Sequence, residues 1–545
     1  MVRVNKNIPM TCKNLLRKAA TASFFVMLSF VASMCANKPE ISYGKYEDTS
    51  VAVYGPYRVL KLPIIKGVKI LNPIQLAKGP QGKLFAANQT GEVYTLRDSD
   101  NDGIEDEAVL YCNVTEQGLR SPGGFAYRGD TVYIGTSEEI RIYIDKNKDN
   151  KADTSWTFFN DIPHSEHPYE WTCGLTFGPD GWLYFVLSTD SWNAGASPDP
   201  RGFRGSILKV SPDGKVVERL ATGIRSVYGM AFNQQGDLFF TDNEGGGNLR
   251  EELNHFVKGA FYGHNPAKYP GIKNPVDPAH PLELEAAPSA IIFNDSDNDF
   301  GSTQGDLFVA FYGPGERWQR GGLGRVKMQR QTDGSYTYKE FPVADIPKLS
   351  GLAFSNDGSL YLAHHGVSDY WYNSITDKTG GYYKVIYDPT LKSRAYKRKE
   401  KSSAEPTASS IESGKQLFAE HACSACHAIG ATAELLGPTL NGISKRLSRE
   451  EILDEINAPS KIIKPSMGGM RVIKNDGQVL LGRVINANEH EISLMVIGNS
   501  IVRIPKNQIK KTENEPKSLM YEGLLDGMNQ NQINDLLDYI YSLDE

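Results

Sequence analysis

The chain carries no excess of positive charge, because 59 Lys and Arg residues stand against 65 Asp and Glu residues. A nucleic acid or an anionic membrane surface requires clustered Lys and Arg, so neither is an expected partner. No segment after residue 36 is long and apolar enough to cross a membrane. Hydrophobic residues make up 40% and charged residues 23%, which are globular values and exclude disordered and fibrous chains.

Cysteine is scarce, with six in 545 residues, and Cys112 and Cys173 either pair or remain buried thiols. Glycine and proline are plentiful at 52 and 29, and they accompany 22 Phe and 27 Tyr. This composition favours a protein of strands and tight reversals. The length predicts more than one domain.

The N-terminal 35 residues have the composition of a signal peptide. Five basic residues precede an uncharged run from Ala19 to Ala36, so we expect export. The run ends in a sequence that resembles a lipoprotein box, which predicts a lipid anchor on Cys35 of a periplasmic or membrane-anchored protein in a Gram-negative bacterium. Ordinary cleavage near Ser33 and an uncleaved anchor are the alternatives.

One pattern recurs through the first two thirds of the chain: an apolar stretch, a glycine-containing turn, and a second apolar stretch. The turn glycines are 47 to 69 residues apart, at positions 82, 129, 181, 236, 305 and 358. Each turn is typical of a hairpin, and the spacing is that of four-stranded blades. The prediction is an all-β, six-bladed propeller over residues 45–388, followed by a polar linker over 389–410.

The segment from Cys423 to His427 has the Cys-x-x-Cys-His spacing of a c-type heme site. Two thiols on one helical turn can bond the porphyrin, and the adjacent imidazole then faces the iron. A redox dithiol or half of a zinc site gives no reason for the adjacent His, and no second Cys pair follows. The pattern predicts covalent heme c in residues 411–545.

A methionine is the expected second axial ligand of such a heme. Met520 is the leading candidate, because it precedes a predicted C-terminal helix; Met467 and Met470 are its rivals. Met495 and Met528 are interpreted as core residues. The Gly437–Leu440 segment resembles the loop that packs against the proximal face of a porphyrin.

An alternating apolar stretch from Val472 to Ile509 predicts a small sheet, with hairpin turns at 475–477 and 498–499. Together with the heme motif, residues 411–545 resemble the planctomycete/verrucomicrobial-type heme-binding domain. The resemblance implies a mainly α, monoheme cytochrome c domain with an inserted sheet, appended to another module.

Two segments of the predicted propeller have oxygen-bearing side chains at alternate positions, as calcium-binding loops do. In the first, Asp98, Asp100, Asp102 and Asp106 surround Gly103, and residues 145–153 repeat the pattern. Hard cations require several oxygens from a short, tightly wound segment, so we expect Ca²⁺ at the first loop. The alternative is an acidic turn without a metal.

The most specific sequence lies in the fourth blade, in the segments 223–232, 242–248, 251–254 and 259–263. These segments resemble the soluble glucose/sorbosone dehydrogenase family, six-bladed propellers that hold pyrroloquinoline quinone (PQQ) and Ca²⁺. The resemblance implies that Arg225 contacts the quinone and that the carbonyls of Gly246 and Gly247 bind Ca²⁺. A looser match at 316–320 implies a second quinone contact from Arg320. The alternative is a turn-rich connection between blades.

The chain departs from that family at the general base. Glu170 stands where the family has a histidine, and His167 lies three residues upstream. Either side chain could accept the proton of a substrate hydroxyl, and the site could also be inactive. His364 and His365 in the last blade are further candidates for the mouth.

The sequence therefore predicts a quinohemoprotein-type dehydrogenase that oxidises a sugar, a polyol or a related alcohol. Electrons would pass through the appended heme c to a periplasmic or membrane redox partner. The alternative is a non-enzymatic propeller that binds a glycan or a protein and carries an electron-transfer cytochrome. Fold alone does not separate these two functions.

Overall fold

The computed structural model describes residues 43–64, 72–164, 172–189, 199–243, 251–264, 276, 278–284, 286–295, 300–313, 321–366, 380–392, 407–427, 429, 435–447, 449–461, 463, 467–488 and 490–543. The predicted signal peptide lies outside these residues, as does most of the predicted linker. Within the described residues, no helix has the length and apolar character needed to span a membrane.

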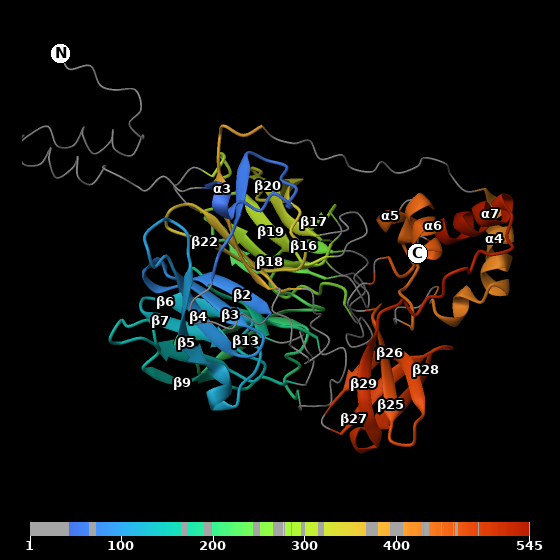
Figure 1. Cartoon of the computed structure of the whole chain (residues 1–545), viewed down its shortest axis with the longest axis horizontal. Coiled ribbons are helices and arrows are strands. Elements are labelled where there is room, and N and C mark those ends of the chain that lie inside the picture. The colour runs from blue at the N-terminus through green and yellow to red at the C-terminus, as the bar shows by residue number, and fades with distance from the viewer. Residues whose placement is uncertain are drawn as a thin grey trace, which may run out of the picture.

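The N-terminal part consists of six four-stranded antiparallel sheets that resemble propeller blades (Figure 1). Five of them are formed by four consecutive strands each. Their strands are β2 (Pro73–Lys78), β3 (Leu84–Asn88), β4 (Glu92–Arg97) and β5 (Glu107–Asn113); β6 (Gly124–Arg128), β7 (Thr131–Gly135), β8 (Ile140–Ile144) and β9 (Thr154–Phe159); β10 (Thr172–Phe177), β11 (Leu183–Leu187), β12 (Ser206–Val210) and β13 (Val217–Thr222); β14 (Met230–Phe232), β15 (Leu238–Asp242), β16 (Glu252–His255) and β17 (His280–Pro281); β18 (Pro288–Phe293), β19 (Leu307–Phe311), β20 (Gly322–Arg330) and β21 (Tyr336–Ala344).

The remaining N-terminal sheet joins the two ends of this part of the chain. Its order is β1-β24-β23-β22, where β1 is the early strand Tyr57–Lys61 and the others are β22 (Leu349–Phe354), β23 (Leu360–His364) and β24 (Gly381–Tyr387). The first strands of successive sheets contact one another in the order β2, β6, β10, β14, β18 and β22, and β22 contacts β2 again. The sheets therefore form a closed ring.

The recurring turn predicted from the sequence is present in every sheet. The six turn glycines each connect the first strand of a sheet to the second, and all six have φ between 58° and 85°. Such left-handed backbone is costly for other residues, which explains the recurrence of glycine.

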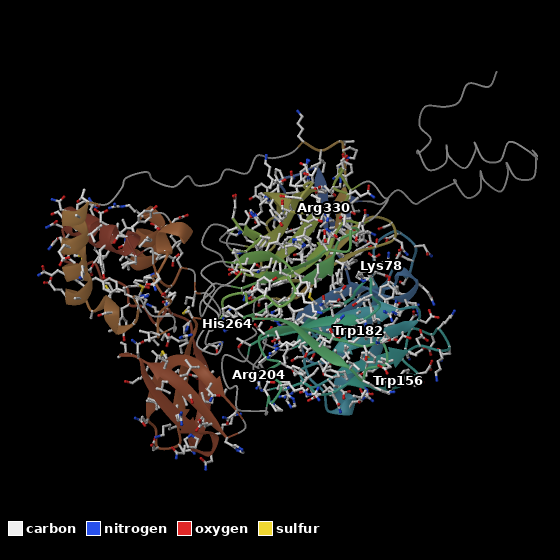
Figure 2. All side chains as sticks on the ribbon, turned by 180° about the vertical axis from the view of Figure 1, so that it is seen from behind. Lys78, Trp156, Trp182, Arg204, His264 and Arg330 are labelled. Atoms are coloured by element: carbon white, nitrogen blue, oxygen red, sulfur yellow. The ribbon has the colours of Figure 1, made fainter. Side chains whose placement is uncertain are left out.

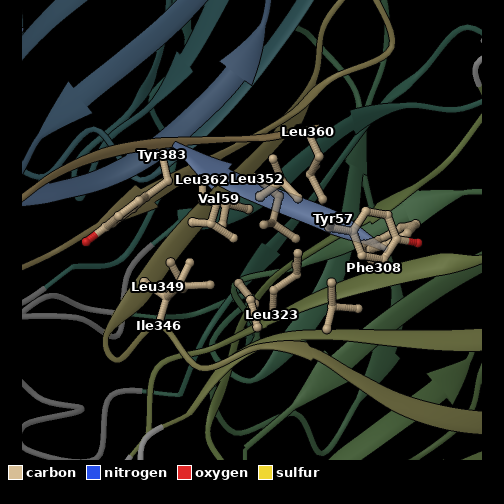
Figure 3. Close-up of a cluster of buried hydrophobic side chains, with 14 of the residues drawn as sticks. Tyr57, Val59, Phe308, Leu323, Ile346, Leu349, Leu352, Leu360, Leu362 and Tyr383 are labelled. Atoms are coloured by element: carbon tan, nitrogen blue, oxygen red, sulfur yellow. The ribbon is translucent and has the colours of Figure 1, made fainter. Parts of the chain in front are cut away.

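Apolar side chains between neighbouring sheets form the core. The cluster in Figure 3 joins side chains of β1, β19, β20 and β22–β24, with Phe308, Leu323 and Leu360 fully buried. Burying one such side chain contributes about 1.5–3 kcal/mol. Strands that are buried on both faces, such as β3 and β19, therefore stabilise two sheet interfaces at once.

Polar side chains near the starts of the first strands link the sheets around the ring axis. Gln75 Nε2 donates to the Gly123 carbonyl at 2.9 Å, and Ser350 Oγ donates to the Pro73 carbonyl at 2.6 Å. Ser289 Oγ likewise donates to the Leu349 carbonyl at 2.5 Å. These side chains line one small cavity together with Cys173 and Tyr228. No disulfide joins Cys112 and Cys173, both of which the structure describes.

The C-terminal part combines helices with a single sheet. The helices are α4 (Ala408–Glu420), α5 (Ile443–Arg446), α6 (Arg449–Asn457) and α7 (Gln530–Tyr541). The sheet has the order β28-β27-β26-β25-β29, with β25 (Gly469–Lys474), β26 (Val479–Ala487), β27 (Glu491–Val496), β28 (Ser500–Pro505) and β29 (Ile509–Glu515). Both hairpin turns expected within this stretch, at 475–477 and 498–499, connect paired strands.

Helices α4 and α7 cross in close contact. A Cβ at Gly414 would collide with the Asp535 carbonyl oxygen, so glycine permits the approach of the two backbones. Ser413 Oγ donates to Asp535 Oδ2 at 2.8 Å, and the rings of Phe418 and Tyr539 meet edge to face. The crossing fixes the end of α4, from which the Cys-x-x-Cys-His segment continues.

Candidate heme and cofactor sites

The Cys-x-x-Cys-His segment begins three residues after α4. Ala422 adopts a left-handed backbone conformation with φ 55°, and Cys423–Ala425 form a single 3-10 turn. The His427 amide donates to the Cys423 carbonyl at 3.0 Å, so one turn of backbone joins the first cysteine to the histidine. Burial raises the pKa of both thiols, and Cys423 packs against the apolar cluster of α4, α6 and α7.

His427 is held in the orientation that a metal ligand needs. Its Nδ1 lies 2.9 Å from the Pro438 carbonyl oxygen, so Nδ1–H donates and Nε2 remains for a metal. Burial lowers the pKa of this imidazole, which favours the neutral form that binds iron. A Cβ at Gly437 would lie 2.8 Å from His427 Cε1, so a larger residue here would press on the imidazole. This arrangement fits covalent heme.

The candidate distal methionines lie in different environments. Met520 is partly buried against the same apolar cluster as Cys423. Met470 belongs instead to the separate core of the five-stranded sheet, whereas Met467 lies just before β25. Met528, interpreted from the sequence as core, contacts the cluster of Met520.

Arg225 lies in the segment between β13 and β14, in the part of the chain that resembles the dehydrogenase family. The side chain is buried, and the Asp242 carboxylate holds the local backbone. Asp242 accepts hydrogen bonds from the amides of Arg225 at 2.9 Å, Ser226 at 2.7 Å and Asn243 at 3.0 Å. Three such bonds compensate a fully buried carboxylate and fix the turn that carries Arg225.

Two further buried polar residues flank this segment. Ile224 N donates to the carbonyl of Gly205, which follows Arg204, and His264 N donates to the Gly223 carbonyl. The side chains of Arg204 and His264 lie on the same side of the N-terminal sheets (Figure 2). The sequence analysis did not identify either residue, since nothing in their local sequence distinguishes them.

Glu252 is the second carboxylate of this region and was also missed. It lies directly opposite Asp242 on β16, and Asn254 Nδ2 donates to it at 3.2 Å. Burial, with a smaller contribution from the Asp242 charge, raises the pKa of Glu252 to about 8. Within the described residues, the buried Ser226 Oγ and Asn254 Oδ1 have no hydrogen-bond partner. A polar ligand would satisfy such atoms, so the region fits a polar cofactor.

Several predicted site residues lie outside the described part of the chain. These are Glu170, His167, Gly246, Gly247 and Arg320. His365, a further candidate from the sequence, is fully buried between Tyr312 Oη and Gln89 Oε1, each at 3.2 Å. It links three sheets, which is a structural role.

The first acidic loop connects β4 to β5 and brings three carboxylates together. Ligand oxygens of Asp98, Asp100 and Asp102 lie within 4.8 Å of one another. Asp106 instead accepts from the amide and hydroxyl of Ser99, both at 2.8 Å. Because antiparallel strands alternate in direction, this loop lies at the end of its sheet opposite to the start of β2.

The loop between β8 and β9 has a similar internal pattern of hydrogen bonds. Asp145 accepts from the amides of Asp149 and Asn150, as Asp98 accepts from those of Asp102 and Gly103. Neighbouring sheets therefore carry equivalent acidic loops at the same end of the ring.

Comparison with known families finds one match in the N-terminal part of the chain and one in the C-terminal part. Residues 411–496 match the family model described as Cytochrome c, so the chain has a C-terminal cytochrome c domain. Residues 69–309 match a model described as Domain of unknown function (DUF7133). A search of curated protein sequences found no match.

Several solved structures are similar to the N-terminal part. The PQQ-bound aldose sugar dehydrogenase of Streptomyces coelicolor is 22% identical over 62% of this chain and 100% of its own, with a TM-score of 0.43. A putative glucose dehydrogenase of Thermus thermophilus is 18% identical over 61% of this chain and 100% of its own, with a TM-score of 0.46. The PQQ domain of pyranose dehydrogenase from Coprinopsis cinerea is 13% identical over 63% of this chain and 97% of its own, with a TM-score of 0.45. The family match confirms the cytochrome c part of the resemblance noted from the sequence.

Proposed function

We propose that this protein is an exported quinohemoprotein-type dehydrogenase that oxidises a sugar, a polyol or a related alcohol. The N-terminal part, residues 45–388, is in this proposal a six-bladed propeller that binds PQQ, and residues 411–545 carry heme c. The observation that carries the proposal is the buried Arg225 turn, fixed by Asp242 beside unsatisfied polar atoms, in the same chain as a heme-attachment motif. A two-electron cofactor needs a one-electron acceptor, and the fusion supplies one.

In the cytochrome c domain, Cys423 and Cys426 would bond the porphyrin, and His427 Nε2 and Met520 Sδ would bind the iron. Heme supplies one-electron transfer. Pro438 holds the imidazole through Nδ1, and the apolar cluster against which Cys423 and Met520 pack would shield the heme from water. Exclusion of water and a thioether ligand both raise a heme potential, which suits an electron acceptor.

In the N-terminal part, Arg225 and Arg320 would pair with the carboxylates of the quinone, and the carbonyls of Gly246 and Gly247 would hold Ca²⁺. PQQ supplies a two-electron acceptor. Asp242 fixes the Arg225 backbone before the cofactor binds, which lowers the entropic cost of binding. Glu170 or His167 is the proposed acceptor of the substrate hydroxyl proton.

The acidic loop at Asp98, Asp100 and Asp102 is proposed as a second, structural Ca²⁺ site. Asp106 is proposed as a further residue of this site. Its place at the end of the sheet opposite to the start of β2 separates it from the quinone site. Lipid anchoring at Cys35 and a periplasmic or membrane redox partner complete the proposal.

Addition of PQQ and Ca²⁺ to the full-length protein tests the enzymatic function. Binding should raise the melting temperature by mass action, and a panel of sugars and polyols should then reduce the heme, followed by its absorption spectrum. PQQ without Ca²⁺ is the control for the metal. If the quinone does not bind under these conditions, the glycan- or protein-binding alternative replaces the enzyme.

A further inference from the structure

The heme-attachment segment (423–427) and the proximal loop (435–438) are linked by one side chain from the five-stranded sheet. Asn499 lies in the turn between β27 and β28. Its Oδ1 accepts from the Leu436 amide at 2.8 Å, and its Nδ2 donates to the Ala425 carbonyl at 2.9 Å. One amide group therefore joins two segments that precede it by 63 and 74 residues.

The backbone of the turn places this amide. Asn499 has φ 60°, a left-handed conformation that Asn adopts more readily than most residues because its short side chain hydrogen-bonds locally. Neither Ala425 nor Leu436 belongs to the sheet, so the side chain of the turn is directed out of the hairpin and into the cytochrome fold.

A second residue of the same sheet reaches the proximal loop. Arg483 on β26 is buried, and its guanidinium donates to the Leu435 carbonyl. In the sheet, Arg483 pairs with Met495 on β27, the strand that leads into the Asn499 turn. Leu435 and Leu436 are consecutive, so Arg483 and Asn499 together restrain the entry to the proximal loop.

The restrained loop is the one that orients the axial imidazole. Directly after Leu436, the Gly437 amide donates to the Cys426 carbonyl at 2.9 Å, and the Pro438 carbonyl accepts from His427 Nδ1 at 2.9 Å. The groups that hydrogen-bond a ligating histidine set its orientation and its basicity. A restraint on residues 435 and 436 therefore acts on the iron ligand through Pro438.

We propose that the five-stranded sheet is a clamp on the proximal side of the heme, and that Asn499, supported by Arg483, is a positioning residue that tunes the heme potential. The proposal rests on the proposed heme attachment at Cys423, Cys426 and His427. Without the clamp, the hydrogen bond between His427 and Pro438 weakens. The imidazole then donates less electron density to the iron, so the midpoint potential rises.

Two variants at position 499 in the full-length, heme-loaded protein test the clamp. Asn499→Gly keeps the left-handed turn but removes both side-chain bonds. Asn499→Asp keeps an acceptor for the Leu436 amide and loses the donor to Ala425. Asn475→Ala is the matched control, because it removes a 2.8 Å side-chain bond to the Asn507 carbonyl elsewhere in the same sheet.

Amide hydrogen exchange over residues 435–437 and the midpoint potential are the two readouts. In Asn499→Gly, exchange in this segment should be roughly tenfold faster, the factor expected for loss of hydrogen bonds of ordinary strength, and the potential should rise. In Asn499→Asp, the Leu436 amide should stay protected, and in Asn475→Ala both readouts should match the wild type.

Wild-type exchange and potential in Asn499→Gly would overturn the proposal, as would equal changes in Asn475→Ala. Heme staining of the denatured wild-type protein separates this result from failure of the heme assignment. A wild-type chain without covalent heme refutes the assignment, whereas the exchange measurement still tests the clamp.

Discussion

The two parts of the chain place their candidate cofactor residues in different ways. In the cytochrome c domain, both thiols and the axial histidine lie within five consecutive residues, and one turn of backbone brings them together. In the N-terminal sheets, Arg225 is held by Asp242, 17 residues later, and Glu252 faces Asp242 from the next strand. A compact motif therefore reveals the first site directly, whereas the second exists only after several strands have paired.

The largest expected effect concerns the compact site. Changing both Cys423 and Cys426 to Ala removes the two thiols that bond the porphyrin, so covalent heme should be lost completely. Heme staining after denaturing electrophoresis measures this loss, and Cys112→Ala should retain the stain. Covalent heme in the double variant would contradict the assignment of the motif.

The distal ligand tests how far the compact motif determines the whole heme site. Met520→Ala should abolish the weak near-infrared sulfur-to-iron band and lower the midpoint potential, because a thioether ligand favours ferrous iron. Met467→Ala, at the rival position, should leave both unchanged. If Met467→Ala removes the band instead, the distal ligand is Met467, in the segment just before β25.

The pH dependence of stability tests the dispersed site. The pKa of Glu252 is raised from 4.5 to about 8, so the folded protein binds more protons than the unfolded chain between these values. Stability should therefore fall as pH rises through this window, by up to about 1.4 kcal/mol per pH unit. Glu252→Gln should flatten this part of the profile in chemical denaturation.

Glu116→Gln, at an exposed position, is the matched control and should keep the wild-type slope. An unchanged slope in Glu252→Gln would show that Glu252 is not the group that binds the extra proton. Asp242 would then be the carboxylate to change next, because the two side chains face each other.

The smallest effect is expected at Arg225. Arg225→Ala removes a charge-assisted contact, so PQQ affinity should fall by about 1.5–3 kcal/mol, measured by calorimetry with Ca²⁺ present. Arg219→Ala changes an exposed arginine on β13 and should bind the quinone as the wild type does. Equal affinities in both variants would remove Arg225 from the quinone site.

The sequence analysis predicted the parts of the fold that depend on local patterns. The six turn glycines and the hairpin turns at 475–477 and 498–499 all lie where the patterns indicate, because a left-handed backbone or a tight turn restricts residue choice at the position itself. The Gly437–Leu440 loop was recognised instead from its resemblance to the loop that packs against a porphyrin.

Contacts between distant segments could not be predicted in this way. Asn499 was identified as a turn residue, yet its bonds to Ala425 and Leu436 depend on how the sheet packs beside the heme segment. Glu252 carries no distinguishing pattern, because its raised pKa results from burial opposite Asp242. Gly437 was assigned to a loop beside the porphyrin, but its close approach to the His427 imidazole could not be read from the sequence.

The pairing of β1 with β24 affects both how the N-terminal ring folds and how it resists mechanical force. The last sheet cannot be completed until the chain has been synthesised as far as Tyr387, so an N-terminal fragment that ends before β24 leaves β1 and β23 without their shared partner. The chain leaves the ring soon after β24, which is paired with β23 on one side and β1 on the other. Tension applied through the cytochrome c domain must therefore disrupt two strand pairings to pull β24 out of the ring.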